Sequence, residues 1–144
     1  MSTYITGDNE ILSVWNGTDA YEPIVCLTSN GLSETVDEIS ARTKCDANGA
    51  TQKQAGAYSY EIPFEGIYAD PEADKAGWAD IRTKLRTLGT FTWKIETTYA
   101  SGTDVEYGTA YFSSLEKTGA IDEFITFSGT LMGSGLINST DPNA

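Results

Sequence analysis

The stretch from Phe91 to Tyr99, FTWKIETTY, alternates apolar and polar residues along its length. Successive side chains of a β-strand point to opposite faces, so Phe91, Trp93 and Ile95 share one face and Lys94 lies on the other. A helix, with a period of 3.6 residues, would scatter these apolar side chains around its circumference. The stretch therefore predicts a half-buried strand, and the fold has to supply a sheet with one covered face.

Several other segments of the chain predict strands in the same way. They are EILSV, PIVCLTS, TVDEISART with Val36 and Ile39 as apolar anchors, AYSYEIPFEGIY, VEYGTAYFSSL and IDEFITFSGTLMGSG. Pro63 cannot donate to a strand ladder, which indicates an edge or a bulge there. Many strands joined by short turns predict a mainly β fold, an antiparallel β-sandwich or barrel with one helix packed against it.

One helix is expected at about residues 71–88. Asp70 is placed as its N-cap, Pro71 at its first position and Gly89 just past its end, the usual positions for these residue types. The apolar residues expected to form one stripe facing the sheet, three or four positions apart, are Trp78, Ile81, Leu85 and Leu88. This spacing is typical of an amphipathic helix.

The segment at about residues 43–57 is polar, holds two glycines and shows no periodicity, which predicts a long loop. The length of 144 residues and the lack of a linker or repeat favour a single domain over 1–144. Flexible arms are expected at about 1–9 and 136–144. The start of the chain lacks the pattern of a signal peptide, and no apolar run is long enough to span a membrane.

The residue types argue against a catalytic site, a metal site and a cofactor site. The chain has no histidine, so its serines lack the usual base and its two cysteines, Cys26 and Cys45, lack partners for a zinc site. The carboxylates near residue 72 are explained by a helix start, and no phosphate-binding loop is present. We expect no catalytic residue, no metal and no cofactor. The net charge of −12 makes a surface that repels nucleic acid.

Aromatic content leaves a carbohydrate-binding module as an alternative. Trp15, Trp78 and Trp93 with eight tyrosines are enough to line a sugar platform on a β-sandwich. Trp78 belongs to the helix stripe and Trp93 to the apolar face of its strand, so both are better explained as core residues. Trp15 is unassigned.

The C-terminal part resembles the major tail tube proteins of long-tailed bacteriophages. The resemblance rests on Thr126–Leu131 (TFSGTL) and Gly133–Gly135 (GSG), preceded by PIVCLTSNGLSETVDEISARTK and YSYEIPFEGIY in matching order. Gly129 stands where a bulkier residue is expected. The resemblance spans about residues 10–137.

This resemblance implies the tail-tube fold, which the tube protein of type six secretion systems shares, so a secretion tube is a second alternative. Six copies are expected to close a ring, and rings to stack into a tube through which DNA passes without specific binding. The implied partners are other copies of the chain and the tail initiator or tip, tape measure and tail terminator proteins. The implied location is the virion tail, assembled in the host cytoplasm without membrane insertion.

Residues 42–54, which include most of the expected loop, carry Arg42, Lys44 and Lys53 against the single acid Asp46, in a chain that is otherwise strongly acidic. In tail tube proteins the corresponding region resembles a loop that reaches the adjacent ring. We therefore expect these three cations to contact the acidic surface of the next ring, because opposite charges favour association.

Overall fold

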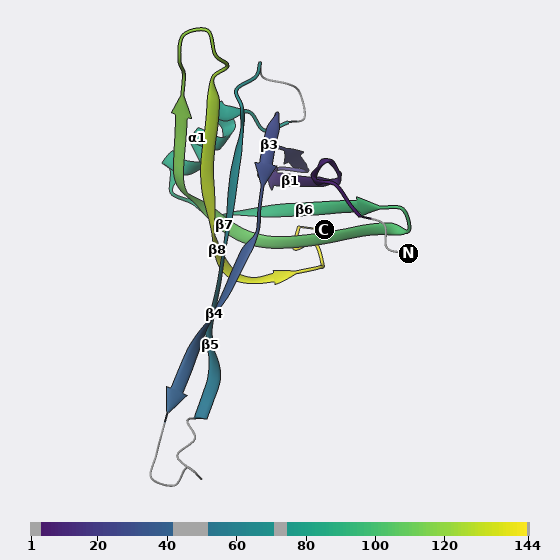
Figure 1. Ribbon diagram of the computed structural model, residues 1–144, viewed down its shortest axis with the longest axis vertical. Coiled ribbons are helices and arrows are strands. Elements are labelled where there is room, and N and C mark those ends of the chain that lie inside the picture. Colours follow the sequence, from purple (N-terminus) through teal and green to yellow (C-terminus); the bar gives the residue numbers. More distant parts are fainter. Residues whose placement is uncertain (1–3, 42–51, 71–74, 144) are drawn as a thin grey trace.

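The structure is a computed structural model that describes residues 4–41, 52–70 and 75–143. Its elements are, in order, η1 (Gly7–Asn9), β1 (Glu10–Trp15), β2 (Tyr21–Pro23), β3 (Leu27–Asn30), β4 (Ser33–Ala41), β5 (Gln52–Ile67), α1 (Trp78–Thr87), β6 (Phe91–Tyr99), β7 (Gly102–Thr118) and β8 (Thr126–Asn138). The predicted mainly β, antiparallel architecture is confirmed, with one α-helix among the described residues (Figure 1).

All eight strands belong to one antiparallel sheet in the order β2-β1-β6-β7-β8-β5-β3, with β4 added to β5. The expected strand at Phe91–Tyr99 is β6, which lies between β1 and β7. Its apolar face is covered as the alternation predicts, because Trp93 is fully buried and Ile95 is nearly so.

The long strand β7 divides this sheet into two parts. It runs beside β6 and then turns a corner toward α1, as Figure 1 shows. Its pairing with β8 shifts register between Tyr107 and Thr109 and again between Phe112 and Ser114. Such bulges bend a strand and increase its twist. The apolar side chains therefore gather on the inner side of the bend, where α1 packs against β7.

An aromatic pair occupies the middle of this core. The Nε1–H of Trp93 donates a hydrogen bond to the Tyr60 hydroxyl (3.1 Å), and that hydroxyl donates to the carbonyl of Thr109 (2.7 Å). Every polar atom of the pair is thus satisfied, which removes the cost of burying it.

The helix begins later than the sequence pattern predicts. Residues 71–74 lie outside the described part of the chain, and 75–77 are not helical. Ala76 is held in an extended conformation, since its N–H donates to the Pro23 carbonyl (2.8 Å) and its carbonyl accepts from Val25 (2.9 Å). The helix therefore starts at Trp78, and Asp80, rather than Asp70, accepts the Gly77 N–H at its N-terminus (3.2 Å).

Three of the four expected stripe residues face the core. Ile81 is fully buried, and Trp78 and Leu85 are partly buried against the same cluster. The expectation for Leu88 is wrong, because it is 91% exposed. Leu88 is itself the left-handed C-cap (φ 61°), a position that the sequence pattern gives to Gly89. The helix ends there, so the stripe no longer directs this side chain to the sheet.

The expected loop at 43–57 is shorter than predicted at its C-terminal end. Residues 42–51 lie outside the described part, but 52–57 are strand, with Lys53 opposite Ser40 of β4. β4 and the first half of β5 form a two-stranded arm that projects from the body (Figure 1). Val36 and Ile39, expected as apolar anchors, are 53% and 55% exposed because no second layer covers this arm.

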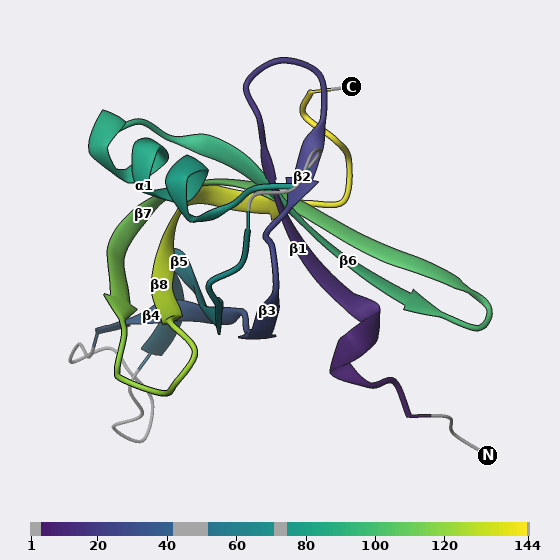
Figure 2. The same cartoon turned by 90° about the horizontal axis from the view of Figure 1, so that it is seen from above.

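The last described residues return to β2. The Tyr21 hydroxyl donates to Asp141 Oδ1 (2.7 Å) and accepts from Asn143 Nδ2 (3.1 Å). Burial, followed by the bond to Asp141, raises the pKa of Tyr21 to about 12. Figure 2 shows the C-terminus beside the β1–β2 turn. β8 extends to Asn138, into the expected C-terminal arm, while the single domain and the flexibility of its arms stay predictions.

Candidate functional site

A row of polar side chains crosses four strands at the α1 end of the sheet. The register places Ser29 of β3 opposite Glu65 of β5, Glu65 opposite Ser128 of β8, and Ser128 opposite Glu116 of β7. Directly paired residues of a sheet share a face, so all four point to the side away from the core. The next row adds Ser114 and Thr130 on that side.

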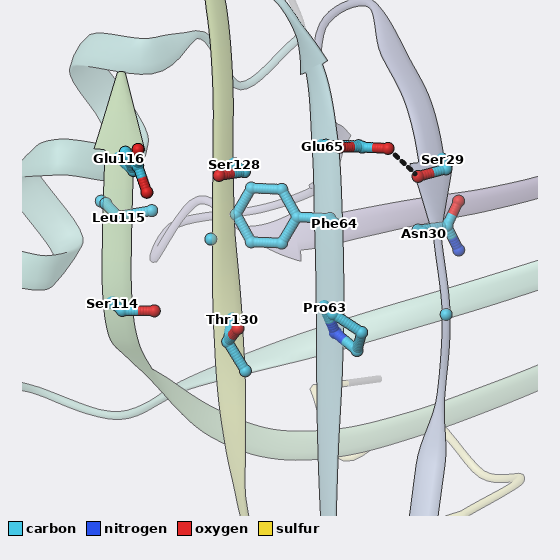
Figure 3. A pocket seen from close by; sticks show the side chains of 12 residues that line it. Ser29, Asn30, Pro63, Phe64, Glu65, Ser114, Leu115, Glu116, Ser128 and Thr130 are labelled. Atoms are coloured by element: carbon cyan, nitrogen blue, oxygen red, sulfur yellow. Dashed lines mark hydrogen bonds between the residues drawn. The ribbon is translucent and has the colours of Figure 1, made fainter. Parts of the chain in front are cut away.

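These rows line an open hollow of about 560 Å³, shown in Figure 3. Ser29 Oγ donates to Glu65 Oε1 (3.2 Å), a bond that orients the carboxylate along the face. The lining residues include two glutamates and no lysine or arginine. The surface therefore presents negative charge and hydroxyl groups, which solvate well and repel phosphate anions.

The opposite face of the same strands explains Gly129. Phe64, Gly129 and Leu115 are directly paired on the core side. A Cβ at Gly129 would lie 2.6 Å from Leu115 Cδ2 and 2.9 Å from Phe64 Cζ. The glycine that departs from the expected bulkier residue thus makes room for these two side chains.

Strands β7, β8, β5 and β3 form the four-stranded part of the sheet that carries these rows, and it has an open edge on each side. β7 pairs with β6 only as far as Ala110, so 111–118 pair with β8 alone among the described strands. On the other side β3 pairs only with β5, and it ends the strand order. Unpaired edges offer rows of backbone donors and acceptors to another chain.

Of the three cations expected to contact a neighbour, the structure places one. Lys53 lies on β5 of the arm, and its Nζ is 3.6 Å from Glu38 Oε1 of the same arm, with both side chains more than half exposed. Arg42 and Lys44 lie outside the described residues. Lys53 is thus already matched by an acid, although an exposed pair of this kind is weak.

The three tryptophans do not form a sugar-binding platform. Trp93 is fully buried, and the Trp78 ring packs at a tilt of 50° against Phe127 of the core cluster, with ring centroids 5.7 Å apart. Trp15 meets Tyr21 edge-on at 4.9 Å, at the other end of the sheet. No arrangement here favours the carbohydrate-binding alternative.

Across 4–41, 52–70 and 75–143, no three His, Cys, Asp or Glu side chains are grouped to hold a metal ion. In the same part of the chain no helix is long and apolar enough to cross a membrane.

The sequence reasoning missed an apolar turn between β7 and β8. Ile121 and Phe124 are 91% and 80% exposed there. The expected strand at IDEFITFSGTLMGSG begins at Thr126 instead of Ile121, so these two side chains lie in the turn before β8 and not on a covered strand face.

No model of a known protein family matches the chain, and no curated protein matches it by sequence. Solved structures do match it. The tail of an empty gene transfer agent particle, refined with C6 symmetry, has a TM-score of 0.79 at 15% identity, covering 96% of this chain and 100% of that chain. The SPP1 tail tube has a TM-score of 0.72 at 13% identity, covering 95% and 80%. The chain has the tail-tube fold. A chain of a native gene transfer agent virion shares this fold, with a TM-score of 0.78 at 14% identity, covering 96% and 100%.

Proposed function

We propose that the chain is the structural subunit of a viral tail tube, in which six copies close a ring and rings stack around a channel for DNA. The observation that carries this proposal is the four-stranded polar sheet with two open edges, in a fold shared with an assembled, sixfold tail. The chain acts by assembly and catalyses no reaction.

The open edges support ring closure. Edge 111–118 of one copy pairs with the β3 edge of the next, so the backbone groups left free in the single chain become hydrogen-bonded. Closing a sheet on itself through its neighbours removes every exposed edge, which protects the strands from random aggregation. The sheets of six copies then form one barrel.

The polar rows indicate which face of the four-stranded sheet lines the channel. With the core on one side, the side bearing Ser29, Glu65, Ser128 and Glu116 lines the interior of that barrel. DNA is a polyanion, and binding it depends on neutralising phosphates with Lys or Arg. A wall of carboxylates and hydroxyls lets DNA pass without retaining it.

The arm supports stacking. It projects beyond the body and has no layer of its own chain against it, so an adjacent ring is the surface that covers Val36 and Ile39. Arg42, Lys44 and Lys53 are proposed to meet acidic groups of that ring. Further proposed partners are the tail initiator or tip, the tape measure and the terminator, and the proposed place is the virion tail, assembled in the host cytoplasm.

Negative-stain electron microscopy of the purified protein tests the proposal. We expect rings or tubes with sixfold end views, formed by the protein alone or after addition of a tail initiator complex. A protein that stays monomeric at high concentration and with the initiator present would overturn it.

A further inference from the structure

The turn between β7 and β8 is an ordered apolar projection. The Glu123 N–H donates to the Ala120 carbonyl (3.3 Å), and Asp122 takes the left-handed conformation (φ 66°). This geometry leaves Ile121 and Phe124 among the most exposed large apolar side chains of the described residues. Two such side chains on one short turn indicate a contact surface, because single scattered ones are normal and clustered ones are not.

A hollow of matching character lies between the C-terminal end of α1 and β7. Its volume is about 600 Å³, within the range of pockets that bind other molecules. It is lined by Lys84, Leu85, Leu88, Gly89, Thr90, Tyr111, Phe112 and Ser113. Its rim therefore combines apolar side chains with the basic end of the helix.

Leu88 gives an independent reason to expect a partner here. It holds the left-handed C-cap position, which is unfavourable for a side chain with a Cβ, although Gly89 is the next residue. It also exposes 91% of its side chain to solvent. A second surface that covers Leu88 would offset the cost of its left-handed backbone and would remove the exposure of its apolar side chain.

The charges of the two surfaces are complementary. Asp122 and Glu123 lie between the two apolar residues of the turn, and Lys84 and Arg86 lie in the last turn of α1. Lys84 already donates to the Trp15 carbonyl (2.8 Å). Arg86 is exposed and makes no ion pair with any residue of the described part; it lies beside the residues that line the hollow and not among them, where an acid of the docked turn can reach it.

We propose that the turn Ala120–Phe124 of one copy docks in the α1–β7 hollow of a second copy. Ile121 and Phe124 then cover Leu85, Leu88 and Tyr111, while Glu123 meets Arg86. The contact cannot form within one chain, because five residues of strand, about 17 Å, separate Ser113 from the end of β7. It joins two different surfaces, so it repeats head to tail and closes a ring or extends a stack.

The choice of a second copy as the occupant rests on the proposed tube function. The experiment therefore measures assembly and docking separately. In a background with Cys26→Ser and Cys45→Ser, one preparation carries Phe124→Cys and another carries Leu88→Cys. The two are mixed under assembly conditions with a mild oxidant and analysed on a non-reducing gel and by electron microscopy.

We expect covalent dimers from the mixture and not from either variant alone, because only the mixture brings the two thiols together at disulfide distance. The matched control replaces Phe124→Cys by Leu136→Cys, another exposed apolar residue, 68% exposed, on β8. It should give no dimer with Leu88→Cys. Adding Glu123→Arg to the Phe124→Cys chain should lower the yield, and Arg86→Glu on the Leu88→Cys chain should restore it.

Tubes without the Phe124–Leu88 dimer would overturn the docking contact and leave the proposed function standing. A specific dimer without rings or tubes would support docking and overturn the tube function. Absence of both would overturn both proposals, and a yield unaffected by Glu123→Arg would overturn the ionic part of the contact.

Discussion

Trp93 and Tyr60 meet edge-on in the centre of the core, with ring centroids 5.7 Å apart and a direct hydrogen bond between them. Gly108 of β7 lies against both rings. A Cβ added there would fall 2.7 Å from Trp93 Cζ2 and 2.7 Å from the Tyr60 hydroxyl. The pair therefore depends on a position without a side chain, on the strand that forms the corner of the sheet.

Gly108→Ala should lower the free energy of unfolding by about 1–3 kcal/mol, the usual cost of overfilling a packed core. Gly102→Ala is the matched control on the same strand, because its Cβ would meet Tyr99 at an ordinary 3.6 Å. It should change stability by no more than about 0.5 kcal/mol. Urea unfolding measures the free energy of unfolding of both variants. Equal losses would show that contact with Trp93 and Tyr60 does not make Gly108 intolerant of a side chain.

The two ends of the helix stripe should respond differently to truncation. Ile81→Ala removes a fully buried side chain and should cost about 2–5 kcal/mol. Leu88→Ala should cost under about 0.5 kcal/mol in the monomer, since the side chain is 91% exposed. Leu85, partly buried, should fall between them. Thermal unfolding of the monomer tests the order, and a large loss for Leu88→Ala would contradict the exposed position.

Stability should depend on pH through Glu106. Burial raises the pKa of Glu106 above its ordinary value of 4.5, and the carboxylates of Asp104, Glu34 and Glu10 raise it further. The folded chain therefore holds this proton at a higher pH than the unfolded chain, so the stability contribution falls as pH rises from 4.5 through the raised pKa.

Glu106→Gln removes this loss, because the amide stays neutral. We expect the variant to be more stable than the parent at pH 7, with the difference disappearing below about pH 4.5. Glu123→Gln, on the exposed β7–β8 turn, serves as the control. Unfolding midpoints measured from pH 4 to 8 test the prediction, which fails if the two variants show the same profile.

The polar face should control the retention of DNA. Glu65→Lys with Glu116→Lys places two cations in the row that we assign to the channel, so tubes assembled with DNA should co-sediment with it at low salt and release it as salt rises. Asp8→Lys with Asp104→Lys makes the same charge change away from that row. Equal retention by both variants would mean that this face does not line the channel.

Reversing the charge of the arm should disturb stacking and leave folding intact. Arg42, Lys44 and Lys53 all changed to Glu should keep the circular dichroism spectrum of the monomer while blocking or shortening tubes. Lys53→Glu alone is the control for the arm itself, because it breaks only the pair with Glu38, worth under about 1 kcal/mol. Tubes of normal length from the triple variant at low salt would show that these charges have no role.

The sequence predicted correctly those strands and helical positions that bury one face, because burial of one face imposes a hydrophobic periodicity on the sequence. β6 is found at Phe91–Tyr99 because its alternation reflects one buried side, and Ile81 is buried for the equivalent helical reason. The arm was partly missed: residues 52–57 pair with β4 in a ribbon exposed on both sides, so burial imposes no pattern on them.

The start of the helix was missed for a different reason. Asp70 and Pro71 have the composition of a helix start, yet the backbone of Ala76 is held extended by Pro23 and Val25, about 50 residues away along the chain. Long-range pairing of this kind overrides local preference. The polar row across β3, β5, β8 and β7 depends likewise on register, which separate strand patterns do not contain.

A single strand, β5, pairs first with β4 in the arm and then with β8 and β3 in the four-stranded sheet. No turn or linker separates these two halves, so the arm and the four-stranded sheet share one continuous strand. A displacement of the arm would therefore act directly on β8 and β3, the two strands that pair with the second half of β5. In the tube that we propose, a contact that the arm makes with an adjacent ring is therefore linked through one strand to the sheet that closes each ring.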